Sequence, residues 1–168
     1  KWVAKYDARG NGIEQAYFGT DGKPCLSKDG IAKWVAKYDA RGNRIEQEYY
    51  GIDGKPCLSK DGFAKWVAKY DARGNMIKQA YFDINGKPCL SKDGFAKSVS
   101  KYDTRGKIIV QEYYGIDGKR CLNNDGYAIS TAQYNNQGKI IERAYYDIDE
   151  KLCHNNEGYA KINMKYDG

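Results

Sequence analysis

The sequence predicts an all-β protein made of tandem 32-residue β-hairpin repeats, which form an elongated solenoid or a spiral antiparallel sheet. Three observations support this fold class. A 32-residue unit recurs along the chain without insertion or deletion. The first four units each contain three turn signals that end in glycine and the fifth contains two, and the runs between them are rich in Val, Ile, Tyr, Phe and Trp with polar residues interleaved. A helix would need a 3.6-residue apolar period and longer stretches free of glycine.

The period makes the whole chain, 1–168, a single repeat array. Its units are 1–32, 33–64, 65–96, 97–128, 129–160 and a partial sixth unit, 161–168. Both ends cut the unit within an element, and the first residue is not methionine. We therefore expect the array to be part of a longer chain, with adjacent repeats of that chain as its first partners.

The first turn of each unit predicts a hairpin. In 33–64 it is Asp39-Ala-Arg-Gly42, in which the aspartate can bond to its own backbone and the glycine tolerates the left-handed conformation. This pattern is typical of a type I turn followed by a glycine bulge, a common three-residue hairpin loop. In the third unit the hairpin would pair residues 63–70 with residues 76–82.

The register of that hairpin stays open at this stage. With the bulged loop, Val67 shares a face with Tyr81, and Trp66 shares the other face with Phe82. A two-residue loop would shift the pairing by one residue and regroup the faces. Both faces carry rings in either case, which predicts a sheet covered on one side and partly solvated on the other.

The second and third turns, such as Gly51-Ile-Asp-Gly54 and Ser59-Lys-Asp-Gly62, flank a short segment with one cysteine. A zinc site needs four Cys or His ligands, but each unit has one cysteine and the chain has one histidine, His154. In a continuous hairpin sheet, equivalent cysteines lie ~9.6 Å apart, too far for a disulfide; one coil per unit would bring them to ~4.8 Å. We expect five free, mostly buried thiols and no metal or other cofactor.

Some positions persist in the two most divergent units, and others change. The persistent framework comprises Tyr6, Tyr38, Tyr70, Tyr102, Tyr134 and Tyr166; Gly10, Gly42, Gly74, Gly106 and Gly138; and Cys25, Cys57, Cys89, Cys121 and Cys153. The tryptophan position changes: Trp2, Trp34 and Trp66 are followed by Ser98, Ser130 and Ile162. A position that accepts Trp, Ser and Ile is not a tightly packed core site.

Charge and composition argue against several classes of function. The net charge is +6, from 28 basic and 22 acidic residues, and the two signs alternate within every unit. This mixture is typical of a solvated surface, so we expect neither nucleic-acid binding nor membrane insertion. The acidic residues of each unit recur on the repeat period, whereas a catalytic site needs one unique cluster of reactive residues. The chain is therefore predicted not to be an enzyme.

The motif Tyr-Asp-x-x-Gly-Asn-x-Ile resembles the YD repeats of bacterial RHS-type proteins. It stands at Tyr6-Asp7, Gly10-Asn11 and Ile13, and it recurs at the equivalent residues of the next two units. The fourth unit has Lys107 and the fifth has Lys139 in place of the motif's asparagine. The resemblance implies antiparallel hairpins that wind into a strip or shell, in large secreted or surface-exposed bacterial proteins that often carry toxins. An extracellular or cell-surface location is expected from this resemblance alone.

A second pattern, Tyr49-Tyr50-Gly-Ile-Asp-Gly-Lys55, is similar to the aromatic hairpin repeats of choline- and glucan-binding modules and of clostridial toxin tails. It recurs at Tyr113-Tyr114-Gly-Ile-Asp-Gly-Lys119. The resemblance implies a solenoid whose neighbouring rings form sugar or choline pockets. The Gly-Trp signature of those repeats is absent from this chain.

Three functions follow from these patterns. The leading interpretation is a non-catalytic structural or protein-interaction array within a larger bacterial secreted or surface protein. The alternative is a glycan-binding module that uses Trp2, Trp34 and Trp66 as stacking platforms. A third hypothesis is a ladder of lysines, Lys33, Lys37, Lys65 and Lys69, that binds an anionic polymer.

Overall fold

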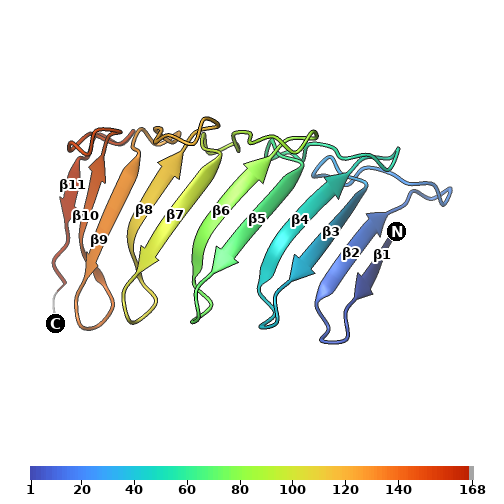
Figure 1. Ribbon diagram of the computed structural model, residues 1–168, viewed down its shortest axis with the longest axis horizontal. Coiled ribbons are helices and arrows are strands. Elements are labelled where there is room, and N and C mark those ends of the chain that lie inside the picture. The colour runs from blue at the N-terminus through green and yellow to red at the C-terminus, as the bar shows by residue number, and fades with distance from the viewer. Residues whose placement is uncertain (167–168) are drawn as a thin grey trace.

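The computed structural model describes residues 1–166 and confirms the predicted fold class. One 11-stranded antiparallel sheet contains every strand, in the order β1 to β11 along the chain. The sheet is open, with β1 and β11 at its two edges, and no helix occurs within residues 1–166. Figure 1 shows the hairpin turns along one long edge of the sheet and the longer connections along the other.

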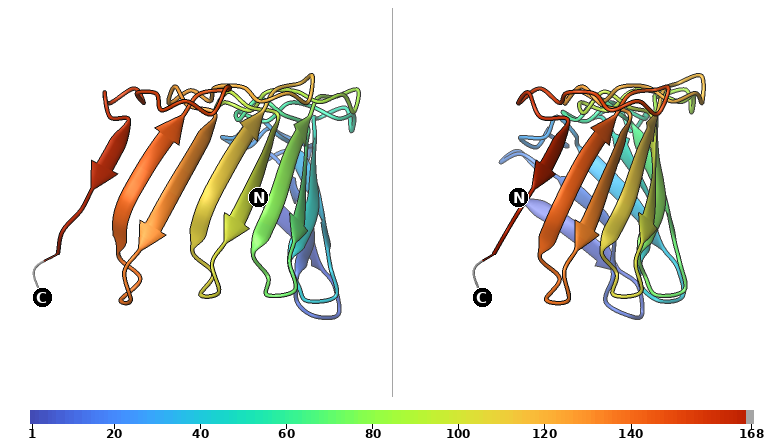
Figure 2. Two further views of the ribbon diagram at one scale, coloured as in Figure 1. Left: turned by 60° about the vertical axis from the view of Figure 1, so that its left-hand side comes forward. Right: turned by 90° about the vertical axis from the view of Figure 1, so that its left-hand side faces the viewer.

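Five hairpins and one further strand make up the sheet. The strands are β1 (Trp2–Tyr6), β2 (Gly12–Tyr17), β3 (Lys33–Tyr38), β4 (Arg44–Tyr50), β5 (Lys65–Tyr70), β6 (Met76–Phe82), β7 (Lys97–Tyr102), β8 (Ile108–Tyr114), β9 (Ile129–Tyr134), β10 (Ile140–Tyr146) and β11 (Lys161–Asn163). Figure 2 shows that the N-terminal strands are turned relative to the C-terminal strands, as the normal twist of a sheet requires.

The hairpin turns have the bulged three-residue form that the sequence predicts. In the third hairpin the amide of Gly74 donates to the carbonyl of Asp71 at 3.1 Å, and the amide of Asp71 donates to the carbonyl of Asn75 at 2.9 Å. Gly74 has φ of 86°, which only glycine adopts without strain. The Asp71 carboxylate also accepts hydrogen bonds from the amides of Arg73 and Asn75, so the side chain closes the turn.

A second irregularity corrects the face assignment expected for the bulged loop. Tyr70 pairs with Met76, but the preceding Lys69 pairs with Lys78, so Ile77 is an extra residue in β6. This bulge shifts the pairing by one residue and places Trp66 opposite Tyr81. The expectation that Val67 shares a face with Tyr81 is therefore wrong. The same extra isoleucine occurs in every hairpin: Ile13, Ile45, Ile77, Ile109 and Ile141.

The connections fold back on the strand that they leave before they enter the next hairpin. In the second repeat, Tyr50 forms an isolated bridge with Pro56, and the amide of Cys57 donates to the carbonyl of Tyr49 at 3.0 Å. The connection ends at Ala64, which is 2% exposed. Its amide donates to the carbonyl of Phe82 and its carbonyl accepts from the amide of Tyr49, so one small residue joins two hairpins.

A continuous stack of aromatic rings forms the core beneath the connections. Centroid distances within a hairpin are 4.6 to 4.7 Å, as between Phe63 and Tyr81, and distances between hairpins are 5.7 to 5.8 Å, as between Tyr49 and Phe63. The rings of the stack, in order, are Tyr49, Phe63, Tyr81, Phe95, Tyr113, Tyr127 and Tyr145. Tilted pairs of this kind contribute ~0.5–1.5 kcal/mol each beyond their burial.

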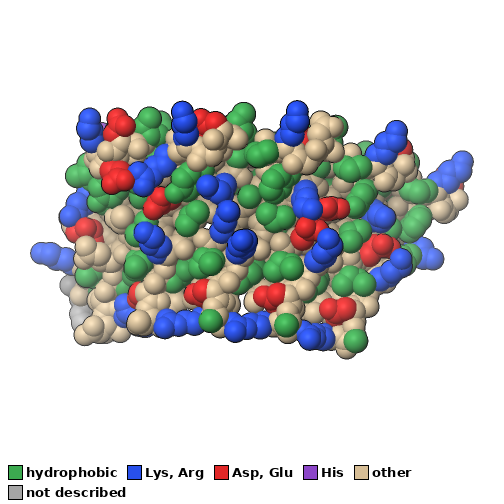
Figure 3. Space-filling view, in the orientation of Figure 1, with side chains coloured by type: hydrophobic (Ala, Val, Ile, Leu, Met, Phe, Trp, Pro, Cys, Tyr) green, Lys and Arg blue, Asp and Glu red, His purple; other side chains and the backbone are tan. Residues whose placement is uncertain are grey.

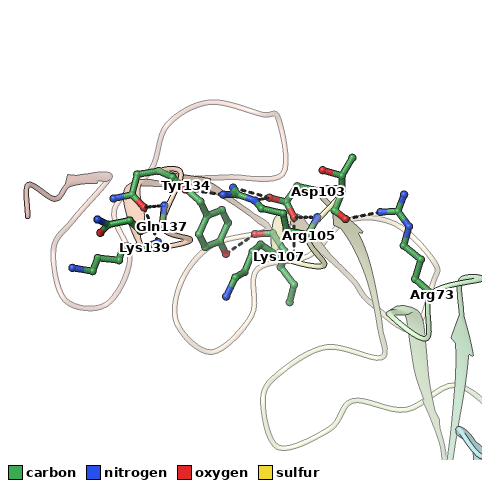
Figure 4. A network of polar contacts seen from close by, with 10 residues as sticks. Arg73, Asp103, Arg105, Lys107, Tyr134, Gln137 and Lys139 are labelled. Atoms are coloured by element: carbon green, nitrogen blue, oxygen red, sulfur yellow. Dashed lines mark hydrogen bonds and ion pairs between the residues drawn. The ribbon is translucent and has the colours of Figure 1, made fainter.

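The hairpin edge is held together by hydrogen bonds between repeats (Figure 4). The hydroxyl of Tyr102 reaches back and donates to the carbonyl of Met76 at 2.8 Å, and that of Tyr134 donates to Ile108 at 2.9 Å. Each turn arginine reaches forward: the Arg73 guanidinium donates to the carbonyl of Thr104 at 3.0 Å. Neighbouring hairpins are therefore joined in both directions at this edge.

We predict that the buried tyrosines resist ionisation. Burial, with Asp93 and Asp61 nearby, raises the pKa of Tyr81 to about 12, and burial also raises the pKa of Tyr113. Because the folded-state pKa lies above that of the unfolded chain, this stabilisation is present below about pH 10. It is lost as the pH rises from 10 through 12. Absorbance at 295 nm should show tyrosines that ionise only near pH 12, one fewer of them in Tyr81→Phe; a single step near pH 10 would contradict the buried stack.

Removing one hydroxyl should weaken the coupling between hairpins. We expect Tyr102→Phe to lower the free energy of unfolding by about 1 kcal/mol, the net value of one hydrogen bond, measured by urea denaturation. The matched control is Tyr6→Phe, because Tyr6 occupies the same repeat position and its hydroxyl has no hydrogen-bond partner within residues 1–166. The control should stay within about 0.5 kcal/mol of the parent protein. Equal losses in both variants would refute this role.

Candidate binding surfaces

The register divides the proposed binding residues between the two faces of the sheet. Trp2, Trp34 and Trp66 share one face with the tyrosines opposite them, Tyr17, Tyr49 and Tyr81; we call this the tryptophan face. Lys33, Lys37, Lys65 and Lys69 share the other face, since Lys37 and Val67 both pair with Glu46; we call this the lysine face. The structure therefore places the two sets on opposite sides of one layer.

The largest hollow of the tryptophan face lies at Trp66 and has a volume of about 590 Å³. Rings of Tyr49, Phe63 and Tyr81 line it together with Trp66. Its polar lining comes from the hairpin edge and from the third turns of two repeats: Arg44, Gln47, Asp61, Lys92 and Asp93. Apolar rings bordered by groups of both charge signs suit a ligand with both apolar and hydroxyl surfaces.

The tryptophans are more exposed at the end of the array than inside it. Trp2, on the edge strand, is 58% exposed, whereas Trp34 and Trp66 are partly buried. The Trp66 indole donates to Gln79 Oε1 at 3.1 Å, and the Arg44 guanidinium lies 5.7 Å from the Trp34 ring centroid. At the equivalent position Ser98 is 2% exposed. The position is thus covered by its neighbours even where the side chain is small.

The proposed lysine ladder is largely neutralised where the second repeat meets the third. Lys37 Nζ lies 2.6 Å from Glu46 Oε1, and Lys65 Nζ lies 2.9 Å from oxygens of Glu46 and Glu48. Lys33 lies over the Tyr50 ring, 4.8 Å from its centroid. Figure 3 shows basic side chains gathered over the central strands of one face and alternating charges along the hairpin edge.

The glutamates of this cluster are ionised at neutral pH. Burial acts to raise the pKa of Glu46, but hydrogen bonds from Lys37 and Lys65 outweigh it and lower the pKa below its ordinary value. Hydrogen bonds from Tyr50 and then Lys65 lower the pKa of Glu48. Lys37 and Lys65 are therefore neutralised by ionised glutamates, which leaves little attraction between these two lysines and a polyanion.

The cysteines lie in the connections and touch the preceding repeat. All five are free, and the thiols of Cys89, Cys121 and Cys153 lie 3.8 to 3.9 Å from glycine carbonyl oxygens of the previous third turn. Each cysteine is half-buried. They border the ring stack at the margin of the sheet, where one side stays open to water. Burial, with a nearby aspartate, raises the pKa of Cys89 and Cys121.

Two rows of exposed apolar residues were missed by the sequence analysis. Leu26, Leu58, Leu90 and Leu122 follow the cysteines and are 48 to 52% exposed. Ile52, Ile84, Ile116 and Ile148 occupy the second turns and are 50 to 61% exposed. Their recurrence at a fixed place beside turn residues is the signal that could have identified them, because a large apolar side chain within a tight turn points outward.

No group of three or more His, Cys, Asp and Glu side chains within residues 1–166 is arranged to hold a metal ion. Over the same residues, no helix is long and apolar enough to cross a membrane.

Comparison with known proteins gives weak likenesses only. No family model and no curated protein matches the chain. A solved structure titled a TcdB2-TccC3-Cdc42 complex matches with 13% identity and a TM-score of 0.29, over 88% of this chain and 9% of that chain. A Photorhabdus luminescens Tc holotoxin pore with a mutation in TccC3 matches with 13% identity and a TM-score of 0.28, over 87% and 9%. This chain spans about a tenth of the length of those chains, and neither likeness assigns it to a family.

The thiols provide a direct chemical test of the connections. Because the thiolate is the reactive form, the raised pKa values and partial burial should slow the reaction of the native protein with a disulfide reagent by about tenfold or more relative to the unfolded chain. In denaturant without a reductant, all five thiols should titrate. Finding three or fewer would mean that disulfides exist, and the observed spacing between repeats would then be wrong.

Proposed function

We propose that the chain is a non-catalytic structural array, in which each 32-residue unit extends one sheet and repeats the same outward surface for protein contacts. The contacts between neighbours are the observation that carries this proposal. They recur at fixed sequence offsets at both edges and in the core. Tyrosine hydroxyls bond 26 residues back, turn arginines 30 or 31 residues forward, and third-turn amides 31 residues back.

Neighbouring units also contact each other through their third turns. The amide of Lys92 donates to the carbonyl of Asp61 at 2.9 Å, and Lys92 Nζ lies 2.7 Å from Asp61 Oδ1. In the next repeat Asn124 stands in place of the lysine. Its backbone amide donates the equivalent hydrogen bond to the carbonyl of Asp93 at 2.9 Å. The backbone contact is thus kept while the side chain changes. In repeat arrays each unit contacts only its nearest neighbours, and these contacts contribute to the stability of the whole array.

The rows of exposed Leu and Ile along the connections support a role in contacts with other proteins. Exposed apolar patches on soluble proteins often mark interaction sites. The proposal extends to a segment of a larger bacterial secreted or surface protein, on the resemblance of the Tyr-Asp motif to YD repeats. It includes the absence of catalysis, since the side chains of the sheet recur without a unique reactive cluster.

Deletion of one whole repeat tests the proposal. Removing residues 65–96 joins Ala64 to Lys97, which takes the place of Lys65 and preserves every offset. We expect a folded protein that is shorter along its long axis by about 9.6 Å, two strand spacings, measured by small-angle X-ray scattering.

The matched control removes half a repeat, residues 65–80, and destroys the offsets. This variant should lose cooperative unfolding in urea, because the rings and third turns no longer meet their partners. If the two deletions behave alike, the repeat is not the structural unit and the proposal fails.

Glycan binding is a second candidate, and the hollow at Trp66 is the observation that favours it. The ring of Trp66 lines an open hollow together with Asp61 and Asp93, whose carboxylates could accept hydrogen bonds from sugar hydroxyls. Recognition of this kind combines stacking with a few placed polar groups.

Tryptophan fluorescence separates the two candidates. A structural array predicts no saturable change when a panel of soluble polysaccharides is added. A glycan site predicts a saturable change that is lost in Trp66→Ser, the residue that the fourth repeat already carries, and kept in Trp2→Ser. Observation of that pattern would place glycan binding first.

A further inference from the structure

The first two repeats pair an exposed lysine of the lysine face with a glutamate on the neighbouring strand. Lys5 Nζ lies 2.9 Å from Glu14 Oε1, and Lys37 Nζ lies 2.6 Å from Glu46 Oε1. In both cases the glutamate is the cross-strand partner of the lysine. In these two repeats the lysine therefore has a glutamate counter-ion on the neighbouring strand.

The third and fourth repeats keep the lysine and lose the glutamate. Opposite Lys69 stands Lys78, and opposite Lys101 stands Val110. Ala80 faces Lys97, where the preceding repeat has Glu48 facing Lys65. Within residues 1–166, none of Lys69, Lys78, Lys97 and Lys101 forms an ion pair. We name these four lysines the central basic patch.

The patch is compact, and the repulsion between its lysines destabilises the sheet. It occupies three adjacent strands, β5, β6 and β7, about 10 Å across. Lys69, Lys78 and Lys101 are exposed, and Lys97 Nζ lies 3.8 Å from the centroid of the Tyr114 ring. Like charges directly opposite each other, as in Lys69 and Lys78, destabilise a sheet. An arriving negative charge would relieve that repulsion.

The surroundings limit the kind of anion that fits. On one side lie Glu46 and Glu48, and on the other lies Glu112. These carboxylates are ion-paired with Lys37, Lys65 and Arg120 and end the unpaired positive surface after three strands, so a long polyanion such as nucleic acid would find no further unpaired positive charge on either side. Val99 lies between Lys97 and Lys101, Val67 lies beside Lys69, and Phe82 lies at the connection end of the patch; these partly buried apolar side chains suit apolar groups of a partner.

We propose that the central basic patch docks a short acidic segment of a partner polypeptide, with apolar side chains between its carboxylates. The segment would lay carboxylates on the lysines and apolar groups on the valines and the phenylalanine. This docking is independent of the structural role, because it depends on the loss, at Lys78 and Val110, of the glutamate that repeats one, two and five carry at this position. Of the four lysines of the predicted ladder, it keeps Lys69 and leaves out the ion-paired Lys37 and Lys65.

The test uses a fluorescein-labelled, end-blocked octapeptide of two Glu-Glu-Leu-Leu units, with a Gln-for-Glu peptide as reference, and fluorescence anisotropy at low ionic strength. We expect saturable binding of the glutamate peptide, weakened by added NaCl, and a higher melting temperature of the protein in its presence. Failure of the glutamate peptide to bind more tightly than its glutamine counterpart would overturn the proposal.

Matched variants separate the patch from overall charge. Lys69→Gln and Lys37→Gln change the same repeat position and the same net charge, but only Lys37 has a counter-ion. Lys69→Gln should weaken peptide binding about two- to fivefold, the effect of one exposed ion pair, while Lys37→Gln leaves it unchanged. Equal effects would show attraction to net charge alone and overturn the proposal.

Lys78→Glu restores the residue that repeats one, two and five carry at this position. It should raise the melting temperature, by pairing Lys69 as Glu46 pairs Lys37, and abolish peptide binding. Greater stability without loss of binding would overturn the proposal. So would tighter binding of a 20-base-pair DNA duplex or of an acidic polysaccharide than of the peptide at the same salt. If Lys69→Gln is unfolded by circular dichroism, Lys101→Gln takes its place in the comparison.

Discussion

The structure depends on one constraint: a two-stranded hairpin cannot bury its own rings. The third, fourth and fifth hairpins each carry one tyrosine and one ring at the connection, as in Tyr81 and Phe63, which lie 4.6 Å apart. The two outer sides of that pair contact the preceding and the following hairpins, through Tyr49 and Phe95, each at 5.7 Å. Because an isolated hairpin is at best marginally stable in water, stability must arise between repeats. The small Ala64, the turn arginines and the tyrosine hydroxyls all bring neighbouring hairpins to the distance that the stack needs.

The sequence was sufficient for the fold class and insufficient for the faces. Turn chemistry is local, so Asp71 and Gly74 predicted the hairpin loop that the structure contains. The register depends on Ile77, whose apolar side chain is typical of a strand whether or not the residue is paired. Its recurrence in every repeat does not distinguish a paired strand residue from the extra residue of a bulge. Only the pairing of Tyr70 with Met76 and of Lys69 with Lys78 identifies the bulge. A single unpaired residue thus moved Trp66 to the face of Tyr81, and with it the composition of both candidate surfaces.

The divergent repeats show which contacts are interchangeable. Arg120 replaces a proline and Glu150 replaces a turn glycine, and the two side chains form an ion pair of 2.5 Å. Glu150 keeps the left-handed backbone of the glycine, with φ of 64°, a conformation that costs a non-glycine residue ~1–2 kcal/mol. An exposed ion pair offsets at most about half of such a cost. The turn geometry is therefore retained at the expense of local strain, and the turn keeps its own hydrogen bonds, from the amide of Glu150 to the carbonyl of Asp147 and from the amide of Asp147 to the carbonyl of Lys151.

The two faces differ in how freely their residues can change. On the tryptophan face a change must respect the ring stack, so Trp66 can become Ser98 only because neighbouring rings and connections still cover the site. On the lysine face the side chains touch mainly their cross-strand partners, so Glu46 can be replaced by Lys78 without disturbing the core. A charge pattern can consequently vary from repeat to repeat on one face while the other face keeps the array intact. This separation is what allows a structural repeat to acquire a local binding patch in its central strands, since the cost of unpaired lysines stays confined to the surface that presents them.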